Sequence, residues 1–265
     1  MKNYAVILAS GIGSRLNESL PKQFSKIAGK SILEHTIEIF EKTPNIDEII
    51  LVILPDYRIL TQEIILKNNY QKISKILNGG KTRKQSSCIG IMSLKDTEAN
   101  VLIHDCARPF LSQDIITKCL EALQTYSAVD VAIPATDTII EVSPCHLITN
   151  IPQRDKLMCG QTPQAFKLSL IQKAHQLAKD DENFTDDCGL ILKYNLGEVF
   201  VVQGESENIK ITYPQDLVLA DKLFQIKNTS APQVSLEQLN GGGGNSGFWW
   251  HKWHWQVHSR NCLLV

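Results

Sequence analysis

The chain has 265 residues, of which 43% are hydrophobic and 21% are charged, and its formal net charge at pH 7 is −1. These values are typical of a globular protein with a substantial core, and they exclude bulk electrostatic attraction to nucleic acid or to an anionic membrane. We find neither an apolar run long enough to span a bilayer nor a secretory signal pattern, so we expect no membrane association. Seven cysteines without CxxC spacing favour reduced thiols in a cytoplasmic protein.

Short apolar runs alternate with segments of helical periodicity. Strands are expected at 4–8, 48–54, 101–104 and 129–134. Helices are expected between them at 31–42, 58–68, 84–94 and 112–126. Because the strands lack polar alternation, both faces of the sheet should be covered by helices. The sequence therefore predicts a doubly wound α/β fold with a mostly parallel, Rossmann-like sheet.

The second half of the chain departs from this alternation. A strand-like segment at about 137–160 contains Pro144 and Pro152, which favours a protruding β-arm. A helix at 168–178 and a strand at 198–203 would then complete the sheet. Beyond residue 227 the composition becomes linker-like. We expect one domain over 1–227 and a disordered tail over 228–265.

The first predicted strand ends in a glycine-rich segment, Leu8-Ala-Ser-Gly-Ile-Gly-Ser-Arg15, and Pro21-Lys-Gln-Phe24 follows. Glycines after a first strand allow backbone amides to approach phosphate oxygens. By itself this pattern is equally typical of an ordinary strand-to-helix turn. It is neither a Rossmann fingerprint, since the third glycine is missing, nor a Walker loop, since GKS/T is missing.

Together with later motifs, this segment resembles the sugar- and polyol-phosphate nucleotidyltransferases, in particular the cytidylyltransferases that act on 2-C-methylerythritol 4-phosphate and on ribitol 5-phosphate. The resemblance covers residues 4 to about 224. The further motifs are, in order, Gly79-Gly-Lys-Thr-Arg83 with Ser86, His104-Asp-Cys-Ala-Arg-Pro109, Asp137-Thr138, Arg154 with Gln161-Thr-Pro-Gln164, Thr185-Asp186, and Asn208-Ile-Lys-Ile-Thr212 with Pro214 and Asp216. Each motif is unspecific alone, but the ordered set is specific.

The resemblance implies that a phosphate oxygen of an acceptor attacks the α-phosphorus of CTP and expels pyrophosphate. Such a reaction requires positioning and charge neutralisation. The catalytic cations would be Arg15, Lys22 and Lys210. The backbone around Leu8, Ala9, Ser10, Gly11 and Gly13 would hold the triphosphate. By the same resemblance, Gly79, Gly80 and Ser86 would contact the cytosine or its ribose, with Arg83 in the same loop.

Asp105 follows a predicted buried strand, where a carboxylate needs a partner. We expect it to bind CTP through Mg²⁺ or another divalent cation, because magnesium is commonly held by few carboxylates together with substrate phosphates. The alternative is an N-cap for the following turn. Glu207 lies near the place where related nucleotidyltransferases offer a second acidic ligand, and we expect it to be a second metal ligand.

The resemblance also implies that the arm pairs with a second subunit, giving a homodimer, and contributes to the acceptor phosphate site. The carried-over acceptor residues are Arg108, Asp137, Thr138, Arg154 and Thr162. Without the resemblance, 136–138 would be interpreted as a solvated strand edge and Arg154 with Asp155 as a surface pair.

Two acceptors remain possible. The segment 151–164, with Gly160 before Gln-Thr-Pro-Gln, is more similar to the ribitol-phosphate branch than to the methylerythritol branch. The leading hypothesis is transfer of a cytidylyl group from CTP to D-ribitol 5-phosphate, for teichoic acid or capsule biosynthesis. The runner-up is 2-C-methyl-D-erythritol 4-phosphate, for isoprenoid biosynthesis. A different class, a catalytically inactive nucleotide-binding scaffold, is disfavoured because Arg15, Lys22 and Asp105 are all present.

The tail contains all four tryptophans, within FWWHKWHWQ at 248–256. When one base is dropped from the codons that encode this peptide, the new frame is rich in glycine and similar to the nucleotide loop of short-chain reductases. Ribitol-phosphate cytidylyltransferases occur fused to such a reductase, so we hypothesise a frameshifted start of a reductase domain. The alternatives are an aromatic interaction patch and a His/Trp-rich metal-binding tail.

Overall fold

The computed structural model describes residues 1–12, 20–179, 181, 184 and 186–228. The predicted 228–265 tail therefore lies, apart from residue 228, outside the described residues. Within the described chain, eight strands form one sheet. Seven of them follow the order β10-β7-β11-β6-β1-β4-β5, and the eighth, β12, also pairs with β7. The sheet strands are β1 (Lys2–Ala9), β4 (Glu48–Ile53), β5 (Ile73–Asn78), β6 (Ala99–Asp105), β7 (Ala128–Pro134), β10 (Met158–Gly160), β11 (Gln164–Lys167) and β12 (Phe200–Gln203).

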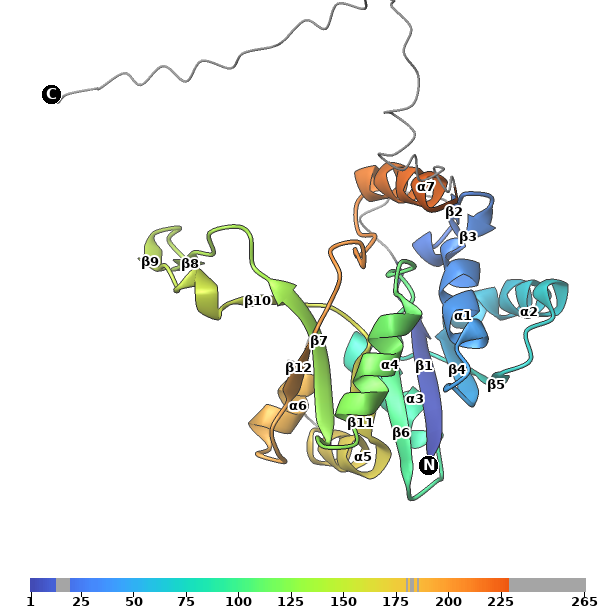
Figure 1. The fold of residues 1–265 in the computed structure, drawn as a ribbon, viewed down its shortest axis with the longest axis horizontal. Coiled ribbons are helices and arrows are strands. Elements are labelled where there is room, and N and C mark those ends of the chain that lie inside the picture. Colours follow the sequence, from blue (N-terminus) through green and yellow to red (C-terminus); the bar gives the residue numbers. More distant parts are fainter. Residues whose placement is uncertain (13–19, 180, 182–183, 185, 229–265) are drawn as a thin grey trace, which may run out of the picture. The chain divides into compact units, whose positions relative to one another are not determined.

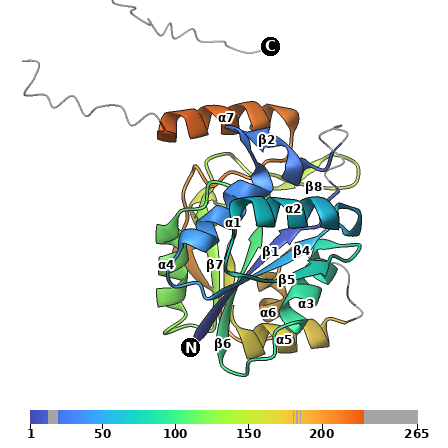
Figure 2. The same ribbon diagram turned by 90° about the vertical axis from the view of Figure 1, so that its right-hand side faces the viewer.

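Parallel pairing dominates this sheet. The pairs β1–β4, β1–β6, β4–β5 and β7–β12 are parallel, whereas β11 runs antiparallel to both β6 and β7. Helices cover both faces (Figures 1 and 2). They are α1 (Ile32–Lys42), α2 (Arg58–Asn68), α3 (Arg83–Met92), α4 (Gln113–Ala122), α5 (Leu168–Leu177), α6 (Cys188–Lys193) and α7 (Pro214–Asn228). The predicted doubly wound α/β fold is confirmed.

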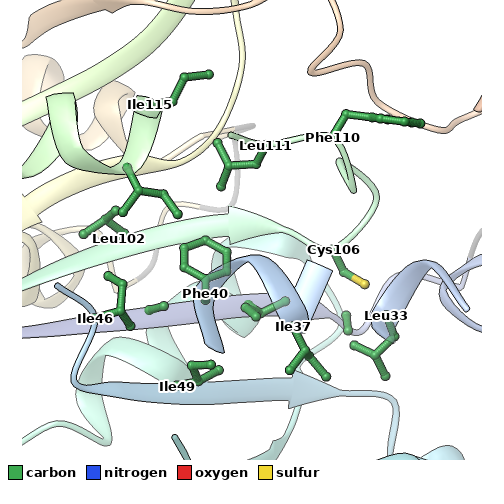
Figure 3. Close-up of a cluster of buried hydrophobic side chains, with 14 of the residues drawn as sticks. Leu33, Ile37, Phe40, Ile46, Ile49, Leu102, Cys106, Phe110, Leu111 and Ile115 are labelled. Carbon is green, nitrogen blue, oxygen red and sulfur yellow. The ribbon is translucent and has the colours of Figure 1, made fainter. Parts of the chain in front are cut away.

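Alternate residues of the strands face two separate apolar clusters. Ile7 of β1 faces a cluster with α1, α4 and α7, whereas its neighbour Val6 faces a cluster with α3, α5 and α6. Figure 3 shows Ile37 and Phe40 of α1 beside Ile49 and Leu102 of the sheet. Because the side chains of a strand alternate between faces, uninterrupted apolar strands bury both sets.

Local signals set the beginnings of several helices. Ser31 and Glu34 form a capping box at the start of α1. Thr82 accepts a hydrogen bond from the backbone N–H of Gln85 and so caps α3, and Ser112 caps α4 through the N–H of Ile115. The cap of α3 matters for the site, because it fixes the loop from Gly79 that connects β5 to the helix.

The arm is present as predicted. The hairpin β8 (Glu141–Val142) and β9 (Ile148–Asn150) extends away from the sheet between β7 and β10, followed by a 3-10 turn, η3 (Arg154–Lys156) (Figure 1). Two further short elements, η1 (Lys22–Phe24) and the ribbon of β2 (Lys26–Ile27) and β3 (Lys30–Ser31), precede α1. Another 3-10 turn, η2 (Pro55–Tyr57), leads into α2. None of the helices in the described part of the chain is long and apolar enough to cross a membrane.

Candidate active site

The carboxyl ends of β1, β4 and β6 lie side by side, since Leu8 pairs in register with Val52 and with Asp105. Beyond them is a hollow of about 340 Å³, called here the first hollow. It is lined by Leu8, Ala9, Ser10, Gly11, Ile12, Lys22, Gln23, Leu54, Gly80, Lys81, Thr82, Arg83, Ser86, Asp105, Cys106, Ala107 and Lys210. This is the edge at which doubly wound sheets bind ligands.

Ser86 joins the two loops that form the wall of the first hollow. Its hydroxyl accepts a hydrogen bond from the Gly80 N–H at 3.1 Å, and it lies 2.7 Å from the Ser10 hydroxyl. The close approach of the two loops requires glycine at position 79, because a Cβ there would lie 2.2 Å from the Cβ of Ser10. The predicted nucleotide-binding loops are thus brought together. Gly79 lies against Ser10 and does not line the first hollow itself.

Asp105 stands at the centre of the charged groups. Its Oδ1 accepts a hydrogen bond from Arg83 Nε at 3.0 Å, and its Oδ2 accepts one from Lys210 Nζ at 2.7 Å. Burial opposes ionisation of this carboxyl, but the two cations outweigh burial and hold its pKa well below the ordinary value. Asp105 is therefore ionised at neutral pH. Its side chain is held by cations rather than serving as a helix cap.

A second hollow, of about 200 Å³, shares Arg83, Asp105 and Lys210 with the first. Its other lining residues are Arg108, Gly160, Gln161, Thr162, Gln164 and Asp186. Two ligands, one in each hollow, would therefore meet over the same three charged side chains. A site of this kind can hold two anionic groups close together, because the cations reduce their mutual repulsion.

Arg108 and Thr162, both predicted acceptor residues, line the second hollow. Arg108 donates to the backbone carbonyls of Asn208 at 2.7 Å and Gly160 at 3.3 Å. The Thr162 hydroxyl accepts from the Asp105 N–H and lies 2.9 Å from Nδ1 of His104. His104 is fully buried, and burial lowers its pKa to about 4. The neutral ring therefore accepts a hydrogen bond from Thr162, and this pair fixes the backbone at Asp105.

Behind Arg83 lies a buried network that the sequence did not reveal. Asp187 accepts hydrogen bonds from Arg83 Nη1 at 2.8 Å, from Ser87 Oγ at 2.7 Å and from His175 Nε2 at 2.9 Å. Burial disfavours the charged imidazole, but the hydrogen bond to Asp187 outweighs it and raises the pKa of His175 to about 9. Burial likewise opposes ionisation of Asp187, and His175 with Arg83 holds the pKa of that carboxyl below its ordinary value. Arg83 is thus fixed between two carboxylates.

Lys22 lies where the motif predicts, on the lining of the first hollow, with Nζ donating to the carbonyl of Ile211 at 3.2 Å. Two further predicted residues of this loop, Gly13 and Arg15, lie outside the described residues.

The remaining predicted residues lie apart from both hollows. Asp137, Thr138 and Arg154 are exposed on the arm and line neither hollow of their own chain. Glu207 is exposed beside Ser206 and also lines neither hollow. The described residues contain no cluster of three His, Cys, Asp or Glu side chains suited to a metal ion. The roles of these four residues stay predictions.

Known proteins match most of the chain in sequence and in fold. A model of the family described as IspD, 2-C-methyl-D-erythritol 4-phosphate cytidylyltransferase, matches residues 4–225. The chain belongs to this family of cytidylyltransferases. The family implies CTP and a sugar phosphate as substrates, and the predicted resemblance is confirmed at this level.

Individual relatives differ in the acceptor that their names give. The chain is 46% identical over 233 residues to the bifunctional ribulose 5-phosphate reductase/CDP-ribitol pyrophosphorylase of Haemophilus influenzae. That match covers 86% of this chain but only 49% of the relative, so the chain spans about half of that protein's length. A 2-C-methyl-D-erythritol 4-phosphate cytidylyltransferase of Thermobifida fusca is 37% identical, with 83% of this chain and 92% of the relative covered.

Solved structures of the IspD family share the fold. The 4-diphosphocytidyl-2C-methyl-D-erythritol synthase from Anaerococcus prevotii has a TM-score of 0.75 and 32% identity, covering 84% of this chain and 96% of that one. The 2-C-methyl-D-erythritol 4-phosphate cytidylyltransferase from Thermus thermophilus has a TM-score of 0.69 and 29% identity, with coverages of 85% and 100%.

Proposed function

We propose that the protein transfers a cytidylyl group from CTP to D-ribitol 5-phosphate, producing CDP-ribitol and pyrophosphate. The observation that carries this proposal is the meeting of two hollows over Arg83, Asp105 and Lys210. The choice of ribitol rests on the 46% identical relative named as a CDP-ribitol pyrophosphorylase and on Gly160 in the 151–164 segment.

In this proposal CTP occupies the first hollow, with its triphosphate beside the loop of Ser10 and Gly11 and near Lys22. The acceptor phosphate occupies the second hollow, beside Arg108. One of its oxygens attacks the α-phosphorus of CTP, the bond from that phosphorus to the oxygen that bridges it to the β-phosphate breaks, and pyrophosphate leaves. Lys22 and Lys210 stabilise the charge that develops around the α-phosphorus, since both line the first hollow.

A magnesium ion fits Asp105. This carboxylate is ionised, it lies where the hollows meet, and magnesium commonly binds one or two carboxylates together with substrate phosphates and waters. When bound, the ion would neutralise charge on the CTP phosphates. Asp105 would hold it, and Glu207 remains the weaker proposed ligand.

We further propose that the arm acts on a second copy of the chain. Asp137, Thr138 and Arg154 cannot reach an acceptor in their own chain's hollows if they stay on the exposed arm. The arm also exposes apolar side chains that a homodimer would cover: Ile139, Ile140, Val142, Leu147, Ile148 and Ile151. Sedimentation of the wild type and of Ile148→Glu tests this, with a dimer expected to become a monomer; a monomeric wild type contradicts it.

The second candidate acceptor is 2-C-methyl-D-erythritol 4-phosphate, favoured by the family description and by the relative from Thermobifida fusca. The two are separated by incubating the protein with CTP, Mg²⁺ and each polyol phosphate in turn, and measuring pyrophosphate. Ribitol 5-phosphate should give the higher kcat/KM. Preference for the methylerythritol compound would transfer the proposal to that acceptor, and release with neither would refute both.

A further inference from the structure

The second hollow is lined by side chains of both charges. Arg83, Arg108 and Lys210 supply cations. The Asp105 carboxylate is paired with Arg83 and Lys210, whereas the half-buried carboxylate of Asp186 has no ion-pair partner among the residues that the structure describes. A phosphate is attracted to the cations and repelled by the unpaired carboxylate. A single ligand that contacts both must therefore be anionic where it meets the cations and carry hydrogen-bond donors where it meets Asp186.

The two glutamines that line the second hollow are already engaged. Gln164 donates to Asp130 Oδ1 at 3.1 Å, and its carbonyl oxygen accepts from the Asp187 N–H at 2.9 Å. Gln161 donates to the carbonyl of Glu205 at 2.8 Å and accepts from Asn208 Nδ2 at 3.3 Å. Their hydrogen bonds to the protein hold both glutamine side chains in place, so few of their donors and acceptors are available to a ligand.

Asp186 differs from the two glutamines. Its Oδ1 accepts a hydrogen bond from the Gly189 N–H at 2.8 Å, in the first turn of α6, and this bond sets the side chain's orientation. Among the described residues, no donor reaches its Oδ2. An ionised carboxylate only accepts hydrogen bonds, so its natural ligand here is a hydroxyl group.

We infer that Asp186 is a specificity-determining residue that recognises the hydroxyl groups of the acceptor, whose phosphate lies beside Arg108 and Lys210. The inference rests on the proposed function and adds to it the orientation of the acceptor. It makes the hollow selective for phosphorylated polyols over phosphate esters of apolar alcohols, because only a hydroxyl satisfies the carboxylate oxygen that the fold leaves available.

The test compares three variants with D-ribitol 5-phosphate and CTP as substrates. Asp186→Ser keeps a side-chain oxygen that can cap the Gly189 N–H but is too short to reach a ligand. Asp186→Asn keeps the length and loses the charge. The matched control is Asp181→Ser, because Asp181 lies on the same segment, pairs with Lys193 and lines neither hollow.

Asp186→Ser should lower kcat/KM for ribitol 5-phosphate about 10- to 100-fold, the loss of a hydrogen bond to a charged group, while the KM for CTP changes less than about twofold. Asp186→Asn should lose less, and Asp181→Ser should match the wild type. An active wild type whose acceptor kinetics are unchanged in Asp186→Ser refutes this inference alone, as does an equal rise in both KM values. A wild type inactive with every polyol phosphate refutes the proposed function and this inference with it.

Discussion

The pair of His175 and Asp187 makes a prediction about stability that involves no substrate. His175 has a pKa of about 9 in the folded protein, whereas an unfolded histidine titrates near 6.5. Between these values the folded state holds a proton that the unfolded state has released. The stabilisation is therefore fully present below about pH 6.5 and is lost as the pH rises through about 9.

The size of the effect follows from this proton. One proton of difference changes the free energy of unfolding by about 1.4 kcal/mol per pH unit. From pH 7 to pH 8.5 the wild type should therefore lose about 2 kcal/mol through His175. His104, whose pKa is lowered to about 4 by burial, acts with the opposite sign and below about pH 6.5, so it does not contribute in this window.

The assay is urea unfolding followed by far-UV circular dichroism at pH 7, 7.5, 8 and 8.5, since all four tryptophans lie in the tail at 248–255. The comparison is with His175→Gln, which can still donate to Asp187 but does not titrate. Burial raises the pKa of the Cys106 and Cys119 thiols to about 12, so these thiols also affect stability as unfolded cysteines ionise. They are unchanged in the variant, and the difference between the two proteins isolates His175.

Cys88 also interacts with His175, so the comparison is repeated in a Cys88→Ser background. The wild type should lose stability with rising pH more steeply than His175→Gln by the stated amount. Equal slopes, or a wild type whose stability rises over this range, would refute the reasoning.

Three further predictions concern the site. Lys22→Ala should lower turnover about 100- to 1000-fold with an unchanged circular dichroism spectrum, because it removes a cation from the first hollow, and unchanged turnover would reject its role. Gly79→Ala should lower the free energy of unfolding in urea by about 1–3 kcal/mol and raise the KM for CTP, because the new Cβ meets Ser10. Gly11→Ala is the control for stability, since a Cβ at Gly11 has open space. Equal stabilities of the two variants would contradict the account. Chelation with EDTA should abolish pyrophosphate release and added Mg²⁺ should restore it, whereas full activity in EDTA would exclude a metal at Asp105.

Much of the fold is predictable because its strands are buried on both faces. Strands β1, β4 and β6 each contain an uninterrupted apolar run, and residues at and beyond their carboxyl ends line the first hollow. The sequence prediction missed β5 and β11. Strand β5 lies at the sheet edge and is mostly half-buried, so its pattern is weak, and β11 has only four residues. Helix α7 was also missed, although Pro214 at its first position was a usable signal.

The site was predictable only in part, for a related reason. Asp105 and Lys210 follow from motifs, but the network behind Arg83 joins residues about a hundred positions apart, because Arg83 and Asp187 meet only when α3 packs near α6. No local sequence pattern predicts such a contact. Asp186 and Gln164 lay in motifs that resemble the family, yet their places on the second hollow depend on the antiparallel path of β11 and the start of α6.

The central claim is that an acceptor phosphate attacks the innermost phosphorus of CTP. It is tested by incubating the protein with ribitol 5-phosphate, Mg²⁺ and CTP labelled with ³²P at either the α or the γ position. The account predicts that the α label enters the nucleotide-linked polyol and that the γ label leaves as pyrophosphate. Transfer of the γ label to the polyol phosphate, or no movement of either label with any polyol phosphate, would contradict it.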